Sequence, residues 1–300
     1  MNFLIYILIY PLVFLISYLP FGVLYIFSDI LYFVMYHIAG YRKATVRENL
    51  HLAFPEKSEG ELKIIEKKFY KHFADLFVEM IKAFHISIKQ MQKHYHIKNP
   101  EIIDKISAKN QNVIVVSGHY ANWEWIVSLG KLIKVKPIAT YLKINNPFFE
   151  KMMLNNRQRF DGKLIETKQL KKYLKTLTSE GNNFVLGLLA DQSPQLHRSR
   201  YWRKFLGVEV PVFVGPEKLA KEYDAGFVFM TVTKIKRGYY EIYFEEITTQ
   251  PNNFENYKLT DIYLDKLEKV IRRQPEFYLW THRRFKHKDR KHEVAHLIEK

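Results

Sequence analysis

The 300-residue sequence predicts an α/β protein, in which a mixed β-sheet is covered by helices and follows a hydrophobic N-terminal membrane-anchor segment. From about residue 110, short runs rich in β-branched residues alternate with stretches of helical spacing. Before Asp29 the chain carries no charged side chain. The alternation predicts the sheet with its covering helices, and the uncharged start predicts the anchor.

The N-terminal segment is almost long enough to cross a bilayer as a single helix. Residues 3–19 form a run of 17 uncharged residues, and a second apolar stretch covers 31–39. A helix of this length spans roughly 26 Å, against roughly 30 Å for the hydrocarbon core of a membrane. Pro11 and Pro20 are expected to kink or end helices. We expect an anchor that spans or re-enters the membrane, with a buried core hairpin as the alternative.

Charge predicts the orientation of the chain and the kind of partner it meets. No Lys or Arg precedes the apolar run, which argues against a signal peptide. The first basic cluster, Arg42, Lys43 and Arg47, follows the anchor and places the remaining chain in the cytoplasm. A formal charge of +16 predicts an acidic partner. We therefore divide the chain into an anchor, 1–40, and a catalytic domain, 41–300.

The elements of the domain follow from capping and periodicity. Ser58 and Glu61 have the spacing of a capping box, and apolar residues follow at helical intervals, which predicts a long helix packed on the core. Strands are expected at 113–117, 137–142, 184–190, 227–232 and 239–247. Further helices are expected near 123–133, 147–160, 168–178, 215–223 and 259–273.

The stretch "VIVVSGHYANWEW", residues 113–125, has the pattern of a catalytic turn. Gly118 permits a sharp exit from the strand, and His119 then lies at the carboxyl edge of the sheet, where open α/β folds bind ligands. Asn122 is a good N-cap and puts Glu124 in the first turn of the next helix. We expect Glu124 to accept a hydrogen bond from one nitrogen of His119. The other nitrogen would then act as a general base toward a hydroxyl, without a metal.

The same stretch resembles a known family. "GHYANWEW" is similar to the HX4E form of the HX4D/E motif in the lysophospholipid acyltransferase superfamily, and more narrowly to the lipid A late acyltransferases of the lauroyl- and myristoyltransferase type. Further blocks agree in the same order along essentially the whole chain: "YRKATVRENLHLAFPEKS" (41–58), "NPFFEKMMLNNRQRF" (146–160), "LGLLADQSP" (186–194), "FVGPEKLAKE" (213–222) and "PEFYLWTHRRFKH" (275–287). Two departures are small: Ala190 stands where many members have Pro, and Gly162 comes one place late.

The resemblance implies acyl transfer from an acyl-carrier-protein thioester to a hydroxyl of a lipid A precursor, with no cofactor besides the donor. It places the enzyme at the bacterial inner membrane, with its catalytic domain in the cytoplasm. His119 and Glu124 would be catalytic. Residues matching the family's R-x-R and Asp-Gln blocks would bind substrate: Arg157, Arg159, Asp191 and Gln192. Because the chain has no cysteine and no G-x-S-x-G motif, we expect direct transfer without an acyl-enzyme.

Two basic stretches leave alternatives open. The stretch 197–205 interleaves basic and aromatic residues, a composition that suits nucleic acid or lipid headgroups; beside an anchor we favour an anionic membrane and expect no nucleic acid. At 282–292, Arg283 and Arg284 are structural or substrate-facing, whereas residues 286–291 suit anionic lipid or an acidic carrier protein. The stretch 282–292 contains three histidines, His282, His287 and His292. Their spacing is not that of metal ligands, so we predict no metal site.

Two other functions compete with lipid A acylation. A neighbouring enzyme of the superfamily would acylate a lysophospholipid, a glycolipid or an amino lipid. A protein of a different class would bind anionic lipid at the membrane surface without catalysis. The intact His119 and Glu124 pair argues against the second, because a binder has no need of a positioned base.

Overall fold

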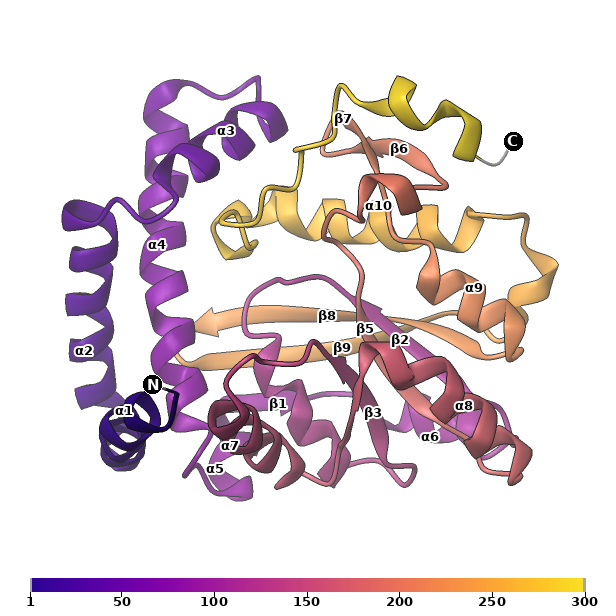
Figure 1. Cartoon of the computed structure of the whole chain (residues 1–300), viewed down its shortest axis with the longest axis horizontal. Coiled ribbons are helices and arrows are strands. Elements are labelled where there is room, and N and C mark those ends of the chain that lie inside the picture. The colour runs from indigo at the N-terminus through magenta and orange to yellow at the C-terminus, as the bar shows by residue number, and fades with distance from the viewer. Residues whose placement is uncertain (1, 299–300) are drawn as a thin grey trace.

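The structure, a computed structural model, describes residues 2–298 and confirms the predicted α/β class (Figure 1). A seven-stranded mixed sheet has the order β1-β9-β8-β2-β5-β3-β4. Its five strands from β8 to β4 run parallel, and β9 and β1 run the opposite way. The strands are β1 (Tyr95–Ile97), β2 (Val113–Ser117), β3 (Pro137–Tyr141), β4 (Lys163–Glu166), β5 (Val185–Leu189), β8 (Gly226–Lys236) and β9 (Tyr239–Thr248). Residue 1 of the predicted anchor, 1–40, and residues 299 and 300 of the predicted domain, 41–300, lie outside the described residues.

Helices cover both faces of this sheet, so β2 is buried along its whole length, as its apolar sequence predicts (Figure 1). One face carries α5 (Ile88–His94), α6 (Glu101–Ser107), α7 (Pro147–Gln158) and α8 (Leu170–Ser179). The other carries α9 (Gly215–Glu222) and α10 (Lys258–Arg273), with a small hairpin of β6 (Trp202–Phe205) and β7 (Val208–Pro211) beside α10. The helix expected at 123–133 is a 3-10 helix, Glu124–Lys131.

Two helices follow the N-terminal segment, α3 (Lys43–Ala53) and α4 (Glu59–Lys82). The predicted capping box is present: the Ser58 hydroxyl accepts from the Glu61 N–H, and the Glu61 carboxylate accepts from the Ser58 N–H. Besides its apolar stripe, α4 buries three carboxylates, those of Glu66, Asp75 and Glu79. A buried carboxylate needs partners, and the N-terminal helices supply several of them.

The N-terminal segment forms two helices that pack on α4. They are α1 (Asn2–Tyr18) and α2 (Phe21–Phe33), separated at Pro20, and α2 continues as a π-helical turn to Ile38. Among residues 2–298, one helical window, Phe21–Ile38, suits a membrane span by length and composition; it is 22% buried and lies beyond the 3–19 run. Side chains of α2 reach α4, since Ser28 donates to Asp75 at 2.7 Å and Tyr25 donates to Glu79 at 3.0 Å. Polar contacts therefore fix α2 to the rest of the fold.

A polar contact also joins the two family blocks at opposite ends of the domain. The Asn49 amide, on α3, donates to the carbonyl groups of Trp280 at 2.8 Å and His282 at 2.7 Å. Arg42 donates to the carbonyl of Thr281 at 3.0 Å. Because Asn49 is buried, these carbonyl groups would lose their partners without it. The segment after α10 is thus held in place by α3.

Replacing Asn49 by Ala removes both of its hydrogen bonds and leaves two carbonyl groups unsatisfied. We expect the free energy of unfolding to fall by about 1–3 kcal/mol in urea titrations. Glu48→Ala, an exposed change on the same helix, is the control and should change stability by less than about 0.5 kcal/mol. Equal losses in the two variants would contradict the assignment.

Candidate active site

The pairing of two neighbouring strands creates the centre of the site. Ser117, the last residue of β2, is the parallel partner of Leu189, the last residue of β5. His119 and Asp191 each follow two residues later, so both leave the carboxyl edge of the sheet at the same place. Nδ1 of His119 lies 2.7 Å from Oδ1 of Asp191. The backbone register thus brings together a base and a carboxylate that are 72 residues apart in sequence.

Burial and charge determine the state of this pair. Asp191 is 1% exposed, and although burial raises the pKa of its carboxyl, contact with His119 and hydrogen bonds hold that pKa below its ordinary value. Burial lowers the pKa of His119, but the carboxylates of Asp191 and Glu124 outweigh it and leave the pKa raised. Because a carboxylate accepts at Nδ1, the proton of the neutral ring is on Nδ1. Nε2 is then the basic atom, and Nε2 of Gln192 lies 3.3 Å from it.

The predicted hydrogen bond between His119 and Glu124 is wrong. Glu124 accepts instead from Nη2 of Arg157 at 2.7 Å. The reason is the turn after His119: Asn122 accepts from the Trp125 N–H at 3.2 Å and donates to Glu79 at 2.6 Å. This anchoring begins the 3-10 helix with Glu124 directed toward α7. Glu124 is a charge near His119, and Asp191 is its hydrogen-bond partner.

The two arginines of the R-x-R block go to different places, because α7 ends at Gln158 between them. Arg157 pairs with Glu124 and lines the cavity that contains His119. Arg159 donates to the carbonyl of Ala83 at 3.0 Å, to that of Ile86 at 3.2 Å and to that of Phe84. Ala83 is the C-cap of α4, and Phe84 and Ile86 follow it, so the guanidinium lies at the C-terminal end of that helix, where a cation is favoured. Arg159 thus connects the end of α7 to the end of α4 and does not line the cavity around His119.

The C-terminal family block holds the catalytic turn from behind. The His119 carbonyl accepts from the Leu279 N–H at 3.1 Å, and the Phe277 carbonyl accepts from the Ala121 N–H at 2.9 Å. Ala121 has a φ of +50°, a left-handed conformation that needs such support. At Gly118 the requirement is space, because a Cβ there would lie 2.7 Å from Cδ2 of Leu267 on α10. The glycine allows α10 to approach the turn.

The same block also positions the loop that carries Asp191. Burial lowers the pKa of His282 to about 4, so its ring is neutral near pH 7. Nε2 of His282 accepts from the Ser193 N–H at 3.1 Å. Arg284 is fully buried and donates to the carbonyl of Pro211 at 3.3 Å. For Arg284 the sequence left a structural or a substrate-facing role open, and its burial favours the structural one. The role of His282 was missed; the one available signal was that it lies in the most specific family block.

Part of the basic stretch 197–205 packs against the fold and forms contacts with α10. Arg203 pairs with Asp261 at 3.0 Å and with Asp265 at 2.5 Å, and the Tyr201 hydroxyl donates to Asp261. Trp202 is buried. The geometry therefore explains Tyr201, Trp202 and Arg203 without a lipid headgroup.

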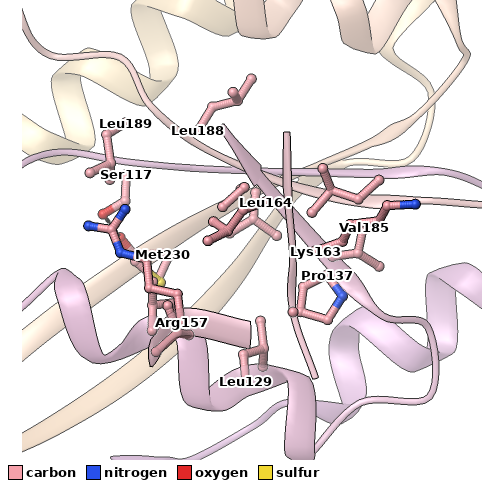
Figure 2. Close-up of a pocket in the computed structure, with 17 residues that line it drawn as sticks. Ser117, Leu129, Pro137, Arg157, Lys163, Leu164, Val185, Leu188, Leu189 and Met230 are labelled. Atoms are coloured by element: carbon pink, nitrogen blue, oxygen red, sulfur yellow. Dashed lines mark hydrogen bonds between the residues drawn. The ribbon is translucent and has the colours of Figure 1, made fainter. Parts of the chain in front are cut away.

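Two adjoining cavities lie beside this edge of the sheet, and His119 lines one of them. The first, about 320 Å³, is lined by His119, Glu124 and Arg157 and by apolar residues of the sheet edge. The second is narrow, about 80 Å³, and its lining is apolar apart from Ser117, Arg157 and Lys163. Figure 2 shows this apolar pocket, with the guanidinium of Arg157 on the same side as Ser117. The cavities share wall residues: Ile126, Val127, Ala139, Arg157, Leu164, Gly187 and Leu189.

This arrangement defines a class of site. A partly buried imidazole with a carboxylate on one nitrogen and no proton on the other can take a proton from a hydroxyl. The pocket next to it is lined mainly by apolar side chains, which suit hydrocarbon. On an α/β sheet, this combination is typical of an enzyme that acylates an alcohol. Among residues 2–298, no three His, Asp or Glu side chains gather as a metal-ligand group.

Comparisons with known proteins agree with this class. Residues 2–287 match the family described as bacterial lipid A biosynthesis acyltransferase, and the chain belongs to that family. It is 27% identical over 252 residues to the lipid A biosynthesis palmitoleoyltransferase of Escherichia coli K12, covering 82% of this chain and 79% of that protein. It is 25% identical over 249 residues to the lipid A biosynthesis lauroyltransferase of the same organism, again covering 82% and 79%. The predicted resemblance is confirmed.

The pKa of His119 distinguishes its two neighbouring carboxylates. Asp191→Asn should lower that pKa below its ordinary value of 6.5, because burial then lacks its main opposing charge. Glu124→Gln, the matched control, should lower it less, because Glu124 is the smaller contributor. NMR titration of the His119 ring measures both shifts. The reverse order would contradict the assignment.

The same shift has a consequence for stability. Since folding raises the pKa of His119, its protonation stabilises the folded protein below pH 6.5, and this contribution is lost as pH rises through the raised value.

Proposed function

We propose that this protein moves a fatty acyl chain from an acyl-carrier-protein thioester to a hydroxyl of a lipid A precursor, with His119 as general base. Membership of the family supports acyl transfer onto lipid A. The observation that carries the proposed mechanism is the 2.7 Å contact between His119 and Asp191, beside an apolar pocket. In this proposal Asp191 orients the base, the role that the sequence had assigned to Glu124.

The proposed reaction is a direct transfer. Nε2 of His119 takes the proton of the acceptor hydroxyl as its oxygen attacks the thioester carbonyl. The resulting tetrahedral intermediate collapses, the carbon–sulfur bond breaks, and the leaving thiolate takes the proton from His119. Asp191 stabilises the imidazolium that exists between the two proton transfers. The absence of cysteine supports a mechanism without a thioester-linked enzyme.

Arg157 suits the charge that develops on the carbonyl oxygen. Its guanidinium lies on the wall shared by the two cavities, where the hydrocarbon chain would meet the base. Glu124 holds one nitrogen of this group at 2.7 Å, which fixes its position before substrate arrives. A positioned cation stabilises an oxyanion without reorganising during the reaction. We assign Arg157 to the oxyanion and Glu124 to holding Arg157.

The net charge of the protein supports the proposed acyl donor, and the exposed apolar side chains of its N-terminal helices support the proposed location. A net charge of +16 favours an acidic carrier protein as partner. Helices α1 and α2 expose large apolar side chains that a membrane would cover: Ile7, Leu12, Phe14, Leu15, Tyr18, Val23, Ile26, Phe27, Ile30 and Phe33. We therefore propose association with the bacterial inner membrane and a cytoplasmic catalytic domain.

Removing the base tests the mechanism. His119→Ala should lower kcat by about 10²- to 10⁴-fold, since general base catalysis is lost. The assay mixes purified protein, acyl-carrier-protein thioester and a Kdo-bearing tetra-acyl lipid A precursor, and mass spectrometry measures the product. Lysophosphatidic acid in place of the precursor tests the alternative acceptor class.

The control for this assay is His292→Ala, an exposed histidine, which should keep wild-type kcat. Transfer by folded His119→Ala at the wild-type rate would end the base assignment. Product formed with lysophosphatidic acid but not with the lipid A precursor would contradict the proposed acceptor.

Filling the apolar pocket tests where the acyl chain lies. Gly187 lines both cavities, and the nearest atom to an added Cβ is the Ile138 carbonyl oxygen at 3.8 Å, so the backbone has room for a Cβ, and the rest of a leucine at this position would occupy cavity space. We expect kcat/KM for a dodecanoyl donor to fall at least roughly tenfold more than for an octanoyl donor. Gly60→Leu, at an open surface position, is the control. Equal loss for both donors would place the chain elsewhere.

A further inference from the structure

A third cavity, larger than the two beside His119, lies on the side of α4 that faces α2. Its volume is about 810 Å³, and its walls come from α2, α4, the end of β8 with the turn into β9, and the segment after α10. The cavity is unusually basic, because five cationic side chains line it: Lys68, Lys71, Lys234, Lys236 and Arg237. None of these residues lines the cavity around His119.

The carboxylates in this cavity are largely used by two of these cations. Arg237 pairs with Asp29 and with Asp75, both at 2.7 Å. Lys234 pairs with Asp75 at 3.2 Å and also donates to Nδ1 of His72 at 3.1 Å. These contacts fix the turn after β8 against α2 and α4. The cavity wall has one more carboxylate, that of Glu276.

Lys68 and Lys71 keep their positive charge available. They are three residues apart on α4, so both point to the same side of that helix. Both are exposed, and neither makes an ion pair with a carboxylate of the described chain. Lys71 lies 5.6 Å from the centre of the Tyr32 ring on α2. Two adjacent, unneutralised ammonium groups at a cavity mouth favour an anion such as a phosphate.

An apolar surface leads into this cavity. Tyr32 and Phe33 of α2 line it, and Phe33 is 53% exposed. Ile26 and Ile30, on the preceding turns of α2, are 60% and 55% exposed. A ligand bound there would meet hydrocarbon along α2 and cations at the cavity. That combination matches a lipid with a charged headgroup.

We propose that this cavity binds the phosphate headgroup of an anionic phospholipid, while the exposed side of α2 contacts the acyl region of the same bilayer. The proposal rests on the membrane association proposed above and names its lipid class. Phe277 links the cavity wall to the catalytic turn, since the His72 ring packs on Phe277 at 4.8 Å and the Phe277 carbonyl accepts from the Ala121 N–H. Lipid bound here would hold α2, α4 and the catalytic turn in one orientation at the membrane.

Vesicle sedimentation of the full chain tests the site. Wild type should bind phosphatidylcholine vesicles containing phosphatidylglycerol more tightly than phosphatidylcholine alone. Lys68→Ala/Lys71→Ala should weaken binding to the anionic vesicles by about 10- to 30-fold, and Lys68→Arg/Lys71→Arg should retain it. The matched control is Lys63→Ala/Lys67→Ala, which removes the same charge from exposed positions of α4 outside the cavity and should cost less than about threefold.

Equal losses in the two alanine pairs would overturn the site while leaving membrane association intact. Failure of every variant and of wild type to bind any vesicle would instead contradict membrane association and the lipid site together. Acyl transfer in detergent is measured separately, so neither result depends on the proposed reaction.

Inorganic phosphate separates a lipid headgroup from a soluble anion. Thermal unfolding in phosphate should raise the Tm of wild type and of Lys63→Ala/Lys67→Ala more than that of Lys68→Ala/Lys71→Ala. Equal stabilisation of all three would contradict a defined phosphate site. Selective protection by phosphate without any difference in vesicle binding would assign the cavity to a soluble phosphate and overturn the lipid proposal.

Discussion

The parallel pairing of β2 with β5 is the constraint on which the site depends. Because Ser117 and Leu189 are register partners, the segments after them leave the sheet side by side, and His119 meets Asp191 there. A shift of one residue in this register would turn the side chains of one strand to the other face of the sheet. β2 is buried on both faces along its whole length and β5 is buried at its start, which fixes the register. The apolar core thus determines the geometry of a polar pair.

Further hydrogen bonds hold the two segments that carry His119 and Asp191 in place. The turn after β2 is strained at Ala121, and backbone groups of Leu279 and Phe277 hold it. The loop after β5 is held by neutral His282. Asn49 in turn holds the segment from which these groups come. The specific sequence blocks near both ends of the domain therefore act on catalysis by position, without contacting the reacting atoms.

Much of the fold could be predicted from the sequence, because long periodic segments determine their own structure. The strand 113–117, the helix after Ser58 and the helices near 147, 215 and 259 all form close to their predicted bounds. The short strands β1, β4, β6 and β7 were missed, since three or four residues carry too little periodicity to stand out. The N-terminal helices were predicted as apolar, but their buried contacts with Asp75 and Glu79 depend on tertiary packing.

The site was predicted in part. His119 was found from its turn, and Asp191 was singled out at a strand end, yet their partnership was missed. Sequence periodicity gives strands but not their order in the sheet, and only the order makes β2 and β5 neighbours. Glu124 was chosen because it is close in sequence, whereas the 3-10 helix directs it to Arg157. Proximity along the chain was a weaker guide than adjacency of strand ends.

The position of one proton tests this account most directly. Nitrogen-15 NMR of the His119 ring, above its pKa, reports which nitrogen is protonated in the neutral imidazole. We predict the proton on Nδ1, held by the Asp191 carboxylate, with Nε2 unprotonated and able to accept from an alcohol, and loss of this preference in Asp191→Asn. A neutral ring protonated on Nε2 in the wild-type protein would contradict the account, because the atom facing the substrate would then be unable to act as a base.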